Sequence, residues 1–182
     1  MASDIQRRTL MGAAGLFIAN AAAQQNKEAG KMAMKLAIGS DHAGFPMKGP
    51  IVEILKSWGH SVKDCGSYTP EPVDFPDIAG ALCAEVTSGR AKRGIMVCGT
   101  GVGASIAANK VNGIRAALVH DVYSAHQCVE HDDVNVICMG AWIIGIRVAE
   151  EILGAYLKAE LSTSEEFRRR VRKLGEMEKR KG

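Results

Sequence analysis

The segment 98–103 holds the residues of this sequence that are best suited to catalysis. It opens with Cys98, carries three glycines and follows a short apolar run at 94–97. Glycines let backbone N–H groups turn inward, and the start of a following helix favours negative charge. We expect this field to lower the pKa of the Cys98 thiol and make it a better base. With the Thr100 hydroxyl beside it, the segment could remove a proton next to a carbonyl and stabilise the resulting anion.

The remaining cysteines do not suggest a shared site. The chain has five cysteines, an odd number, and no two of them have the Cys-x-x-Cys spacing of zinc or redox motifs. We therefore predict no metal site. Free cysteines are commonly small core residues, and this is the competing interpretation of Cys98 itself.

Acidic and imidazole groups occur at two further positions. Asp41 and His42 follow the apolar run 35–39, where they could bind the hydroxyls or the phosphate of a sugar. His131 follows a helical pattern at 122–130. A histidine there is equally well explained as a favourable partner for the helix C-terminus, so its role stays open.

Hydrophobic periodicity predicts alternating strands and helices that would position these groups. Strands are expected at 35–39, 60–65, 94–98, 114–119 and 134–139, and helices at 45–58, 78–87, 102–111, 122–130, 142–161 and 164–179. This order predicts an α/β fold, a Rossmann-like three-layer sandwich with a five-stranded parallel sheet and a C-terminal helical extension. Such folds bind ligands at the carboxyl ends of the strands, where the strand order reverses. Asp41, Cys98 and His120 all come just after, or at the end of, an expected strand.

A dinucleotide-binding site is the main alternative for the Cys98 segment. Gly99, Gly101 and Ala104 match the spacing of that fingerprint, and Asp121 lies about 20 residues further on. Against this interpretation, the segment follows the third strand rather than the first, and the chain leaves no room for a separate substrate domain. We therefore expect no nucleotide cofactor.

Composition and charge argue against several classes of protein. The 182 residues suit one domain, and the 47% hydrophobic and 24% charged residues are typical of soluble globular proteins. A net charge of +3 and an aromatic content of 5% argue against a nucleic-acid partner. The basic run at 168–173 lies among glutamates at helical spacing, which is typical of a solvated helix face.

The first 31 residues differ in character from the rest. Arg7 and Arg8 precede an Ala/Gly-rich stretch of about 15 residues or fewer, below the roughly 20 that a membrane-spanning helix needs. Residues 1–31 thus resemble a twin-arginine export signal with a linker, and predict a periplasmic protein without a stable membrane anchor. The alternative is a cytoplasmic protein whose natural start lies near Met34, at the beginning of the predicted domain 34–182.

Five segments together make the chain resemble type B ribose-5-phosphate isomerase, whose family also includes galactose-6-phosphate and allose-6-phosphate isomerases. These segments are residues 39–45 (GSDHAGF), 74–77 (DFPD), 98–103 (CGTGVG), 107–110 (AANK) and 113–116 (GIRA). The match runs in order from residue 34 into the C-terminal helix, with spacing that fits throughout.

The resemblance implies a cofactor-free aldose–ketose isomerisation through an enediol. Cys98 would move the proton between C1 and C2, His131 would act as the acid that opens the sugar ring, and Thr100 would help to stabilise the enediolate. The sugar and its phosphate would be bound by a larger group of residues: Asp41, His42, Gly99, Gly101, Val102, Gly103, Asp132, Arg170 and Arg115. The family resemblance also implies a homodimer or homotetramer with its sites at the subunit interface.

Three departures from the family pattern concern the substrate-binding positions. Asp132 replaces a common asparagine, and Trp142 replaces an arginine after the fifth strand. Glu166 replaces the first arginine of the C-terminal motif, of which Arg170 remains. Each lost charge-assisted hydrogen bond is worth roughly 1.5–3 kcal/mol. The first hypothesis is an isomerase of a pentose or hexose phosphate, with the conversion of ribose 5-phosphate to ribulose 5-phosphate as the default. With the export signal, these changes suggest a second hypothesis, an isomerase of an unphosphorylated sugar outside the cytoplasm. A third, a non-catalytic sugar-binding module, conflicts with the retention of the expected base and acid.

Overall fold

The computed structural model describes residues 33–180, so the predicted export segment 1–31 lies outside the described residues. The elements are, in chain order, β1 (Lys35–Ser40), α2 (Phe45–Ser57), β2 (Ser61–Asp64), α3 (Phe75–Thr87), β3 (Arg93–Cys98), α4 (Val102–Ala108), β4 (Ala116–Leu118), α5 (Val122–Asp132), β5 (Val136–Gly140), α6 (Ile146–Lys158) and α7 (Glu165–Lys179). Every strand and helix expected from the hydrophobic periodicity is found among them.

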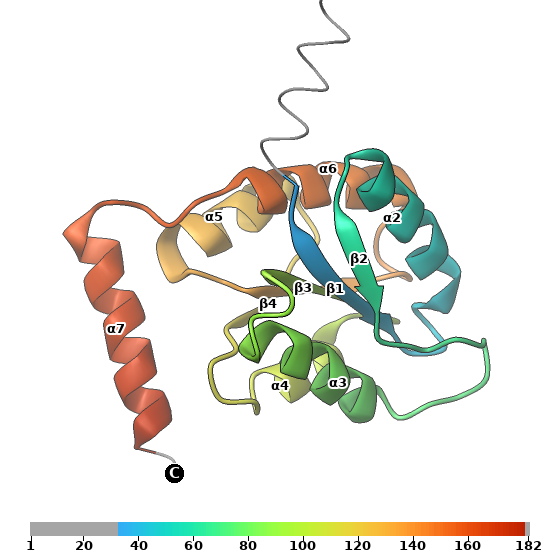
Figure 1. The fold of residues 1–182 in the computed structure, drawn as a ribbon, viewed down its shortest axis with the longest axis horizontal. Coiled ribbons are helices and arrows are strands. Elements are labelled where there is room, and N and C mark those ends of the chain that lie inside the picture. Colours follow the sequence, from blue (N-terminus) through green and yellow to red (C-terminus); the bar gives the residue numbers. More distant parts are fainter. Residues whose placement is uncertain (1–32, 181–182) are drawn as a thin grey trace, which may run out of the picture. The chain divides into compact units, whose positions relative to one another are not determined.

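All five strands run parallel in one sheet, in the order β2-β1-β3-β5-β4. The chain moves from β1 outward to β2 and then crosses back to β3, so the strand order reverses between β1 and β3. Helices α2, α5 and α6 cover one face of the sheet, and α3 and α4 cover the other (Figure 1). The predicted three-layer α/β fold is confirmed, and its switch point lies between the first and third strands.

Two apolar clusters hold the sheet between its helical layers. One joins Ile38 and Ile137 on one face of the sheet to Tyr156 of α6. The other joins the opposite face to α3 and α4, through residues such as Leu82, and it includes Cys98. Because both faces are covered, β3 and β5 are buried along their whole length and form nearly continuous apolar runs.

Two helices begin at positions that differ from the sequence-based expectation. α3 begins at Phe75 rather than at 78, because Pro76 suits the first turn of a helix, where its missing N–H costs nothing. α6 begins at Ile146 rather than at 142. Residues 141–142 instead donate backbone hydrogen bonds to the carbonyl groups of 98–99. The segment after β5 is therefore tied to the candidate catalytic loop.

The C-terminal helix α7 packs against α5 rather than against the sheet, and none of its residues is buried. Arg93 at the start of β3 holds the end of α6, after which the chain continues to α7. Its guanidinium donates hydrogen bonds to the carbonyl oxygens of Tyr156 and Ala159 at the end of α6. Neither α7 nor any other helix within residues 33–180 is long and apolar enough to cross a membrane.

Candidate active site

Asp41 and Cys98 meet at the switch point of the sheet. Asp41 follows β1 and Cys98 ends β3, and the two strands pair through Ser40 and Val97 one residue earlier. The Cys98 thiol donates a hydrogen bond to Oδ2 of Asp41, with 2.8 Å between sulfur and oxygen. The two residues are 8% and 4% exposed, so the pair is nearly buried. The sequence predicted both residues at strand ends but not this contact, which depends on which strands are neighbours.

The turn after β1 holds the Asp41 carboxylate in place. The Gly44 N–H donates to Oδ1 of Asp41 at 2.8 Å, and the Asp41 N–H donates to the carbonyl oxygen of Val97 at 3.3 Å. A Cβ atom at Gly44 would overlap that carbonyl and lie 2.8 Å from the Cys98 nitrogen. Position 44 therefore requires glycine, because the turn packs directly on the backbone of β3. This packing brings the carboxylate to the thiol.

The loop after Cys98 turns sharply into α4. Gly101 has a φ of +80°, in the left-handed region, and a Cβ atom there would lie 2.7 Å from Leu118. A Cβ atom at Gly103 would lie 2.8 Å from the Phe75 ring. The glycines of this loop thus allow close packing against neighbouring elements as well as an unusual backbone conformation.

Replacing Gly101 with alanine should destabilise the protein by about 1–3 kcal/mol, because backbone strain adds to the clash with Leu118. Urea unfolding followed by circular dichroism measures this change. Gly80→Ala is the matched control, since Gly80 lies inside α3 with no atom near its missing Cβ. That control should be neutral or slightly stabilising. A Gly101→Ala variant as stable as the wild type would contradict the packing described here.

The pKa of the Cys98 thiol is raised, which is opposite to the expectation from the sequence. Burial is the largest cause, and the hydrogen bond to Asp41 and the negative charge of that residue add to it. Backbone N–H groups of Gly101 and Gly99 lower the pKa as expected but are outweighed. The prediction was wrong because it considered only the turn and the helix start. A carboxylate beside a thiol disfavours the thiolate, and the sequence does not reveal that contact.

Thr100 and His42 lie at the same edge of the sheet as the thiol–carboxylate pair, and both are exposed. The Thr100 hydroxyl oxygen accepts a long hydrogen bond from the Val102 N–H at 3.4 Å. Nδ1 of His42 accepts the Val73 N–H at 3.5 Å, which connects His42 to the loop between β2 and α3. Both side chains are therefore open to a ligand at this edge.

Trp142 covers the beginning of the candidate catalytic loop. Its backbone N–H donates to the Gly99 carbonyl at 3.0 Å, and a Cβ atom on Gly99 would lie 2.8 Å from the indole ring. The side chain is nevertheless 73% exposed, so most of the ring is open to solvent at the carboxyl edge of the sheet. An aromatic ring thus stands beside the loop where the family pattern has an arginine.

Two polar residues that support this edge belong to no recognisable motif in the sequence. Lys48 is buried on α2, and its ammonium group donates to both carboxylate oxygens of Asp64 at 2.7 and 2.8 Å and to the Ser67 carbonyl at 2.6 Å. Nε2 of His120 accepts the Gly140 N–H at 3.0 Å. The helical periodicity of the sequence could have identified Lys48 as buried. It lies three and seven residues before Ile51 and Leu55, the buried apolar residues of the same helix, and therefore on the same face.

His131 lies at the opposite edge of the sheet from Cys98. It is in the last turn of α5, which runs back from the carboxyl end of β4 to the amino end of β5. Cys98 is paired with Gly140 at the other end of β5, and five strand residues span roughly 13 Å. The His131 ring stacks on Phe167 of α7, with centroids 3.9 Å apart. Within one chain, the expected base and the expected acid face different ends of the sheet.

The other predicted ligands, Asp132, Arg115 and Arg170, also lie away from Cys98. Arg115 precedes β4 and is paired with Asp133, with 2.5 Å between Nη2 and Oδ2. Arg170 on α7 is paired with Glu166, with 2.5 Å between Nη2 and Oε1. The structure therefore divides the predicted site into two groups of residues within one chain.

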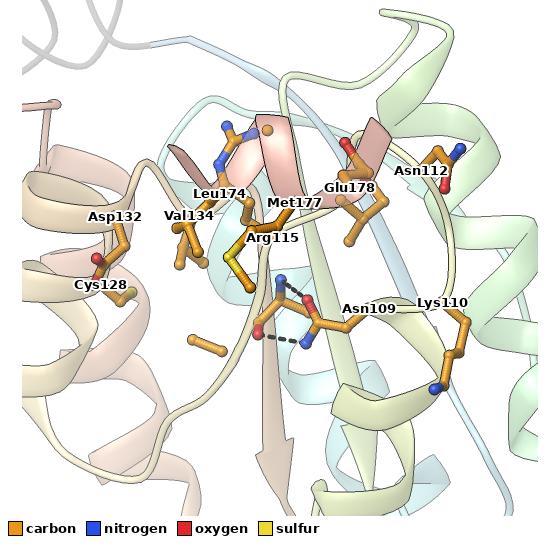
Figure 2. Close-up of a pocket in the computed structure, with 14 residues that line it drawn as sticks. Asn109, Lys110, Asn112, Arg115, Cys128, Asp132, Val134, Leu174, Met177 and Glu178 are labelled. Carbon is orange, nitrogen blue, oxygen red and sulfur yellow. Dashed lines mark hydrogen bonds between the residues drawn. The ribbon is translucent and has the colours of Figure 1, made fainter. Parts of the chain in front are cut away.

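A cavity of about 620 Å³ lies between α7, α5 and the segment 109–117. In Figure 2, Asp132 and Lys110 lie on opposite sides of this cavity, with Arg115 and Met177 between them. Its wall contains acidic, basic, amide and apolar side chains. Two residues that the family pattern assigns to the substrate thus line this cavity rather than the surroundings of the thiol.

Asp121, which a dinucleotide site would place on a ribose, has a structural role at the start of α5. It is the N-cap residue, and its side chain accepts the Ser124 N–H at 2.7 Å. Within residues 33–180, no group of three or more histidine, cysteine, aspartate or glutamate side chains is arranged to hold a metal ion.

Comparisons with known proteins show the family and the fold. The family model described as ribose/galactose isomerase matches residues 36–174. Ribose-5-phosphate isomerase B of Escherichia coli is 42% identical over 126 residues, which cover 69% of this chain and 85% of that protein. The D-erythrulose-4-phosphate isomerase of Pectobacterium atrosepticum is 45% identical over 129 residues, covering 70% and 84%. The structure of Clostridium thermocellum ribose-5-phosphate isomerase B matches with a TM-score of 0.80 and 44% identity, covering 82% of this chain and 100% of that one.

Proposed function

The chain belongs to the ribose/galactose isomerase family and is an aldose–ketose isomerase of sugar phosphates, and we propose that its substrate is ribose 5-phosphate. The observation that carries the proposal is the nearly buried Cys98 thiol at the switch point of the sheet, hydrogen-bonded to Asp41 and followed by a glycine-rich loop whose N–H groups at Gly99 and Gly101 act to lower the thiol pKa. A thiol beside backbone donors suits the removal of a proton next to a carbonyl.

Cys98 acts as the base that carries the proton between C2 and C1 of the sugar. Loss of the C2 proton from the aldose leaves an enediolate whose negative charge is largely on O1. The Thr100 hydroxyl and the N–H groups of the loop 99–103 stabilise that charge, because they are held in place before the charge develops. No cofactor takes part in this sequence of proton transfers.

A second copy of the chain completes the site, as a homodimer or as a pair of such dimers. Because Cys98 and His131 face opposite edges within one chain, the ring-opening acid is supplied by the partner copy. A two-fold axis that brings the amino edge of one copy to the carboxyl edge of the other makes two equivalent sites. Large apolar side chains exposed near the carboxyl edge support such a contact: Val102, Ile106, Tyr123, Trp142 and Ile143.

In this arrangement the phosphate is bound by His42 of one copy and Arg170 of the other. Asp132, beside the ring-opening histidine, contacts the sugar. Arg115 contributes less than Arg170, because the Asp133 carboxylate and carbonyl already hold its guanidinium. The phosphate end is the weakest part of the site, since Glu166 competes with the phosphate for the guanidinium of Arg170.

Freeing Arg170 from Glu166 should therefore strengthen phosphate binding. Glu166→Gln removes a negative charge beside the phosphate, so KM for ribose 5-phosphate should fall by about 2- to 10-fold with little change in kcat. Because the pair is exposed, the gain should shrink at high salt. Steady-state kinetics at two salt concentrations measure both effects. Glu165→Gln, which breaks the neighbouring exposed pair with Arg172, is the matched control. A KM that is unchanged or raised by Glu166→Gln would place Arg170 outside the phosphate site.

An isomerisation assay with several sugars tests the substrate. The panel is ribose 5-phosphate, allose 6-phosphate, and free ribose, allose and rhamnose. Turnover of ribose 5-phosphate supports the proposal. Turnover of the free sugars alone would overturn it in favour of an isomerase of unphosphorylated sugars, the candidate favoured by Glu166 beside Arg170 and by Trp142 in place of an arginine. Binding of a sugar without any turnover would indicate a sugar-binding module.

We also propose that residues 1–31 direct export to the periplasm, with 34–182 as the isomerase domain. The paired arginines and the apolar stretch support this proposal. The intact mass of protein recovered from the periplasm tests it, since a cleaved chain should begin near Gln24. Protein found only in the cytoplasm would contradict export and favour a start near Met34.

A further inference from the structure

The Asp41 carboxylate is held towards the sulfur of Cys98. Its two oxygens are both engaged within the protein: Oδ1 accepts the Gly44 N–H and Oδ2 accepts the Cys98 thiol, each at 2.8 Å. The side chain is nearly buried between the turn after β1 and the end of β3. Its orientation is therefore set by the fold before any sugar arrives.

Cys98 begins each turnover as a thiol. Burial, the hydrogen bond to Asp41 and the charge of that carboxylate all raise its pKa, so little thiolate exists near neutral pH. Only the thiolate can take a proton from carbon. The thiol proton must therefore move to another group before the C–H bond is broken. Among the described residues, Oδ2 of Asp41 is the carboxylate oxygen within hydrogen-bond distance of the sulfur.

We propose that Asp41 is the proton acceptor for Cys98, so that the thiolate forms while Asp41 holds the thiol proton. The inference rests on the proposed function in one respect, namely that Cys98 is the base of the isomerisation. It gives Asp41 a role that contact with sugar hydroxyls does not include.

The protons balance within this pair and the substrate. The S–H bond breaks, its electron pair stays on sulfur, and Oδ2 of Asp41 becomes protonated. The thiolate then takes the C2 proton of the aldose, the C–H electron pair forms the C1=C2 double bond, and the carbonyl pair moves onto O1. The new thiol returns this proton to C1, and the O2 hydroxyl proton passes to O1 as the C2 carbonyl forms. Asp41 finally gives its proton back to the sulfur.

Titratable groups on the neighbouring elements do not compete for this proton. Cys138 on β5 is buried, and burial raises its pKa far above the usual range, so it stays a thiol. His120 after β4 accepts the Gly140 N–H, and His42 after β1 accepts the Val73 N–H. Both imidazoles are therefore engaged with backbone groups, whereas Asp41 is in direct contact with the sulfur.

Asp41→Asn tests the proposal, because asparagine keeps the shape and can accept the Gly44 N–H but cannot take a proton. Loss of the carboxylate removes two causes that raise the pKa of Cys98, so the thiolate should form at lower pH. Iodoacetamide should then modify the tryptic peptide 94–110 faster near neutral pH. At pH values where Cys98 of the variant is still a thiol, kcat should nevertheless fall by roughly 100- to 10,000-fold, with a much smaller change in KM, because no neighbouring group then accepts the thiol proton. A more reactive thiol in a slower enzyme is the expected signature.

The pH profile separates this role from a structural one. The wild type should keep its turnover at pH values where alkylation shows Cys98 to be protonated. In Asp41→Asn, turnover should instead rise with pH in step with thiolate formation. Asp41→Glu keeps a carboxylate and should restore part of kcat. Asp121→Asn is the matched control, because Asp121 lies at the same edge but caps α5, a role that asparagine fills equally well.

An unchanged kcat with a raised KM in Asp41→Asn, or an unchanged rate of alkylation, would overturn the proposal and leave Asp41 as a sugar ligand. If Asp41→Asn does not fold, Asp41→Glu decides instead, since a displaced carboxylate should lower kcat more than it changes KM. If the wild type turns over no sugar phosphate, the proposed function fails. The alkylation rates of the free enzyme would still decide whether Asp41 controls the Cys98 proton.

Discussion

Replacing Cys98 with alanine is expected to lower kcat for ribose 5-phosphate by roughly 1,000-fold or more, because the variant has no group at the position of the sulfur to accept the C2 proton. The loop N–H groups and Thr100 remain, so a small residual rate should persist. KM should change little, because the residues proposed to bind the phosphate are untouched. Steady-state kinetics and exchange of the C2 hydrogen with deuterated water measure the loss.

Cys83→Ala is the control for this variant. Cys83 is a buried thiol of α3 in the same apolar cluster as Cys98, so its replacement removes the same volume from the same core. Each variant should lose about 1 kcal/mol of stability or somewhat more through the small cavity left behind. Cys83→Ala should nevertheless keep full activity. Equal activities of the two variants would remove Cys98 as the base.

Mixing two inactive variants should restore activity if the site lies between subunits. A Cys98→Ala chain still provides His131, and a His131→Ala chain still provides Cys98. A heterodimer of the two therefore has one intact site and one site that lacks both groups. Random assembly makes half of the dimers heterodimers, so about one quarter of the wild-type activity should return. Co-expression of the two chains, with separately purified homodimers as the baseline, measures the recovery.

The same experiment can contradict a shared site. If Cys98 and His131 acted within one chain, neither variant would have a complete site, and the mixture would stay as inactive as its parents. Native mass spectrometry verifies that heterodimers have formed, so that failed exchange is not mistaken for an intrachain site. A double variant carrying both substitutions, mixed with the wild type, is the matched control. Its heterodimers have no complete site beyond those that the wild-type homodimers supply.

The local features of the site could be predicted well from the sequence. Periodic apolar residues located the strands that end near Asp41 and Cys98, and the glycines at 101 and 103 marked a tight turn into a helix. These signals are reliable because each depends on neighbouring residues along the chain. The start of α6 was missed, since the backbone of residues 141–142 is hydrogen-bonded to residues 98–99 of the candidate catalytic loop, which is distant in sequence.

The site as a whole could not be predicted in the same way. The family resemblance implied one site at a subunit interface with Cys98 and His131, but only the structure shows that α5 carries His131 to the other edge of its own sheet. Lys48 belongs to no motif, because its role depends on contacts with Asp64 at the end of β2 and with Ser67 in the loop that follows. Charge and burial act through space, so sequence neighbours alone do not reveal them.

The sequence by itself determined the α/β fold and the position of the Cys98 loop, because hydrophobic period and glycine spacing are local properties, and the resemblance of its motifs to a known family implied the kind of chemistry. Only the tertiary structure decided that Asp41 lies against Cys98, 57 residues away in the chain. The strand order β2-β1-β3-β5-β4 makes these two strand ends neighbours. Burial and that contact raise the pKa of the Cys98 thiol, whereas the sequence led us to expect a lowered pKa. The cysteine is thus part of a thiol–carboxylate pair.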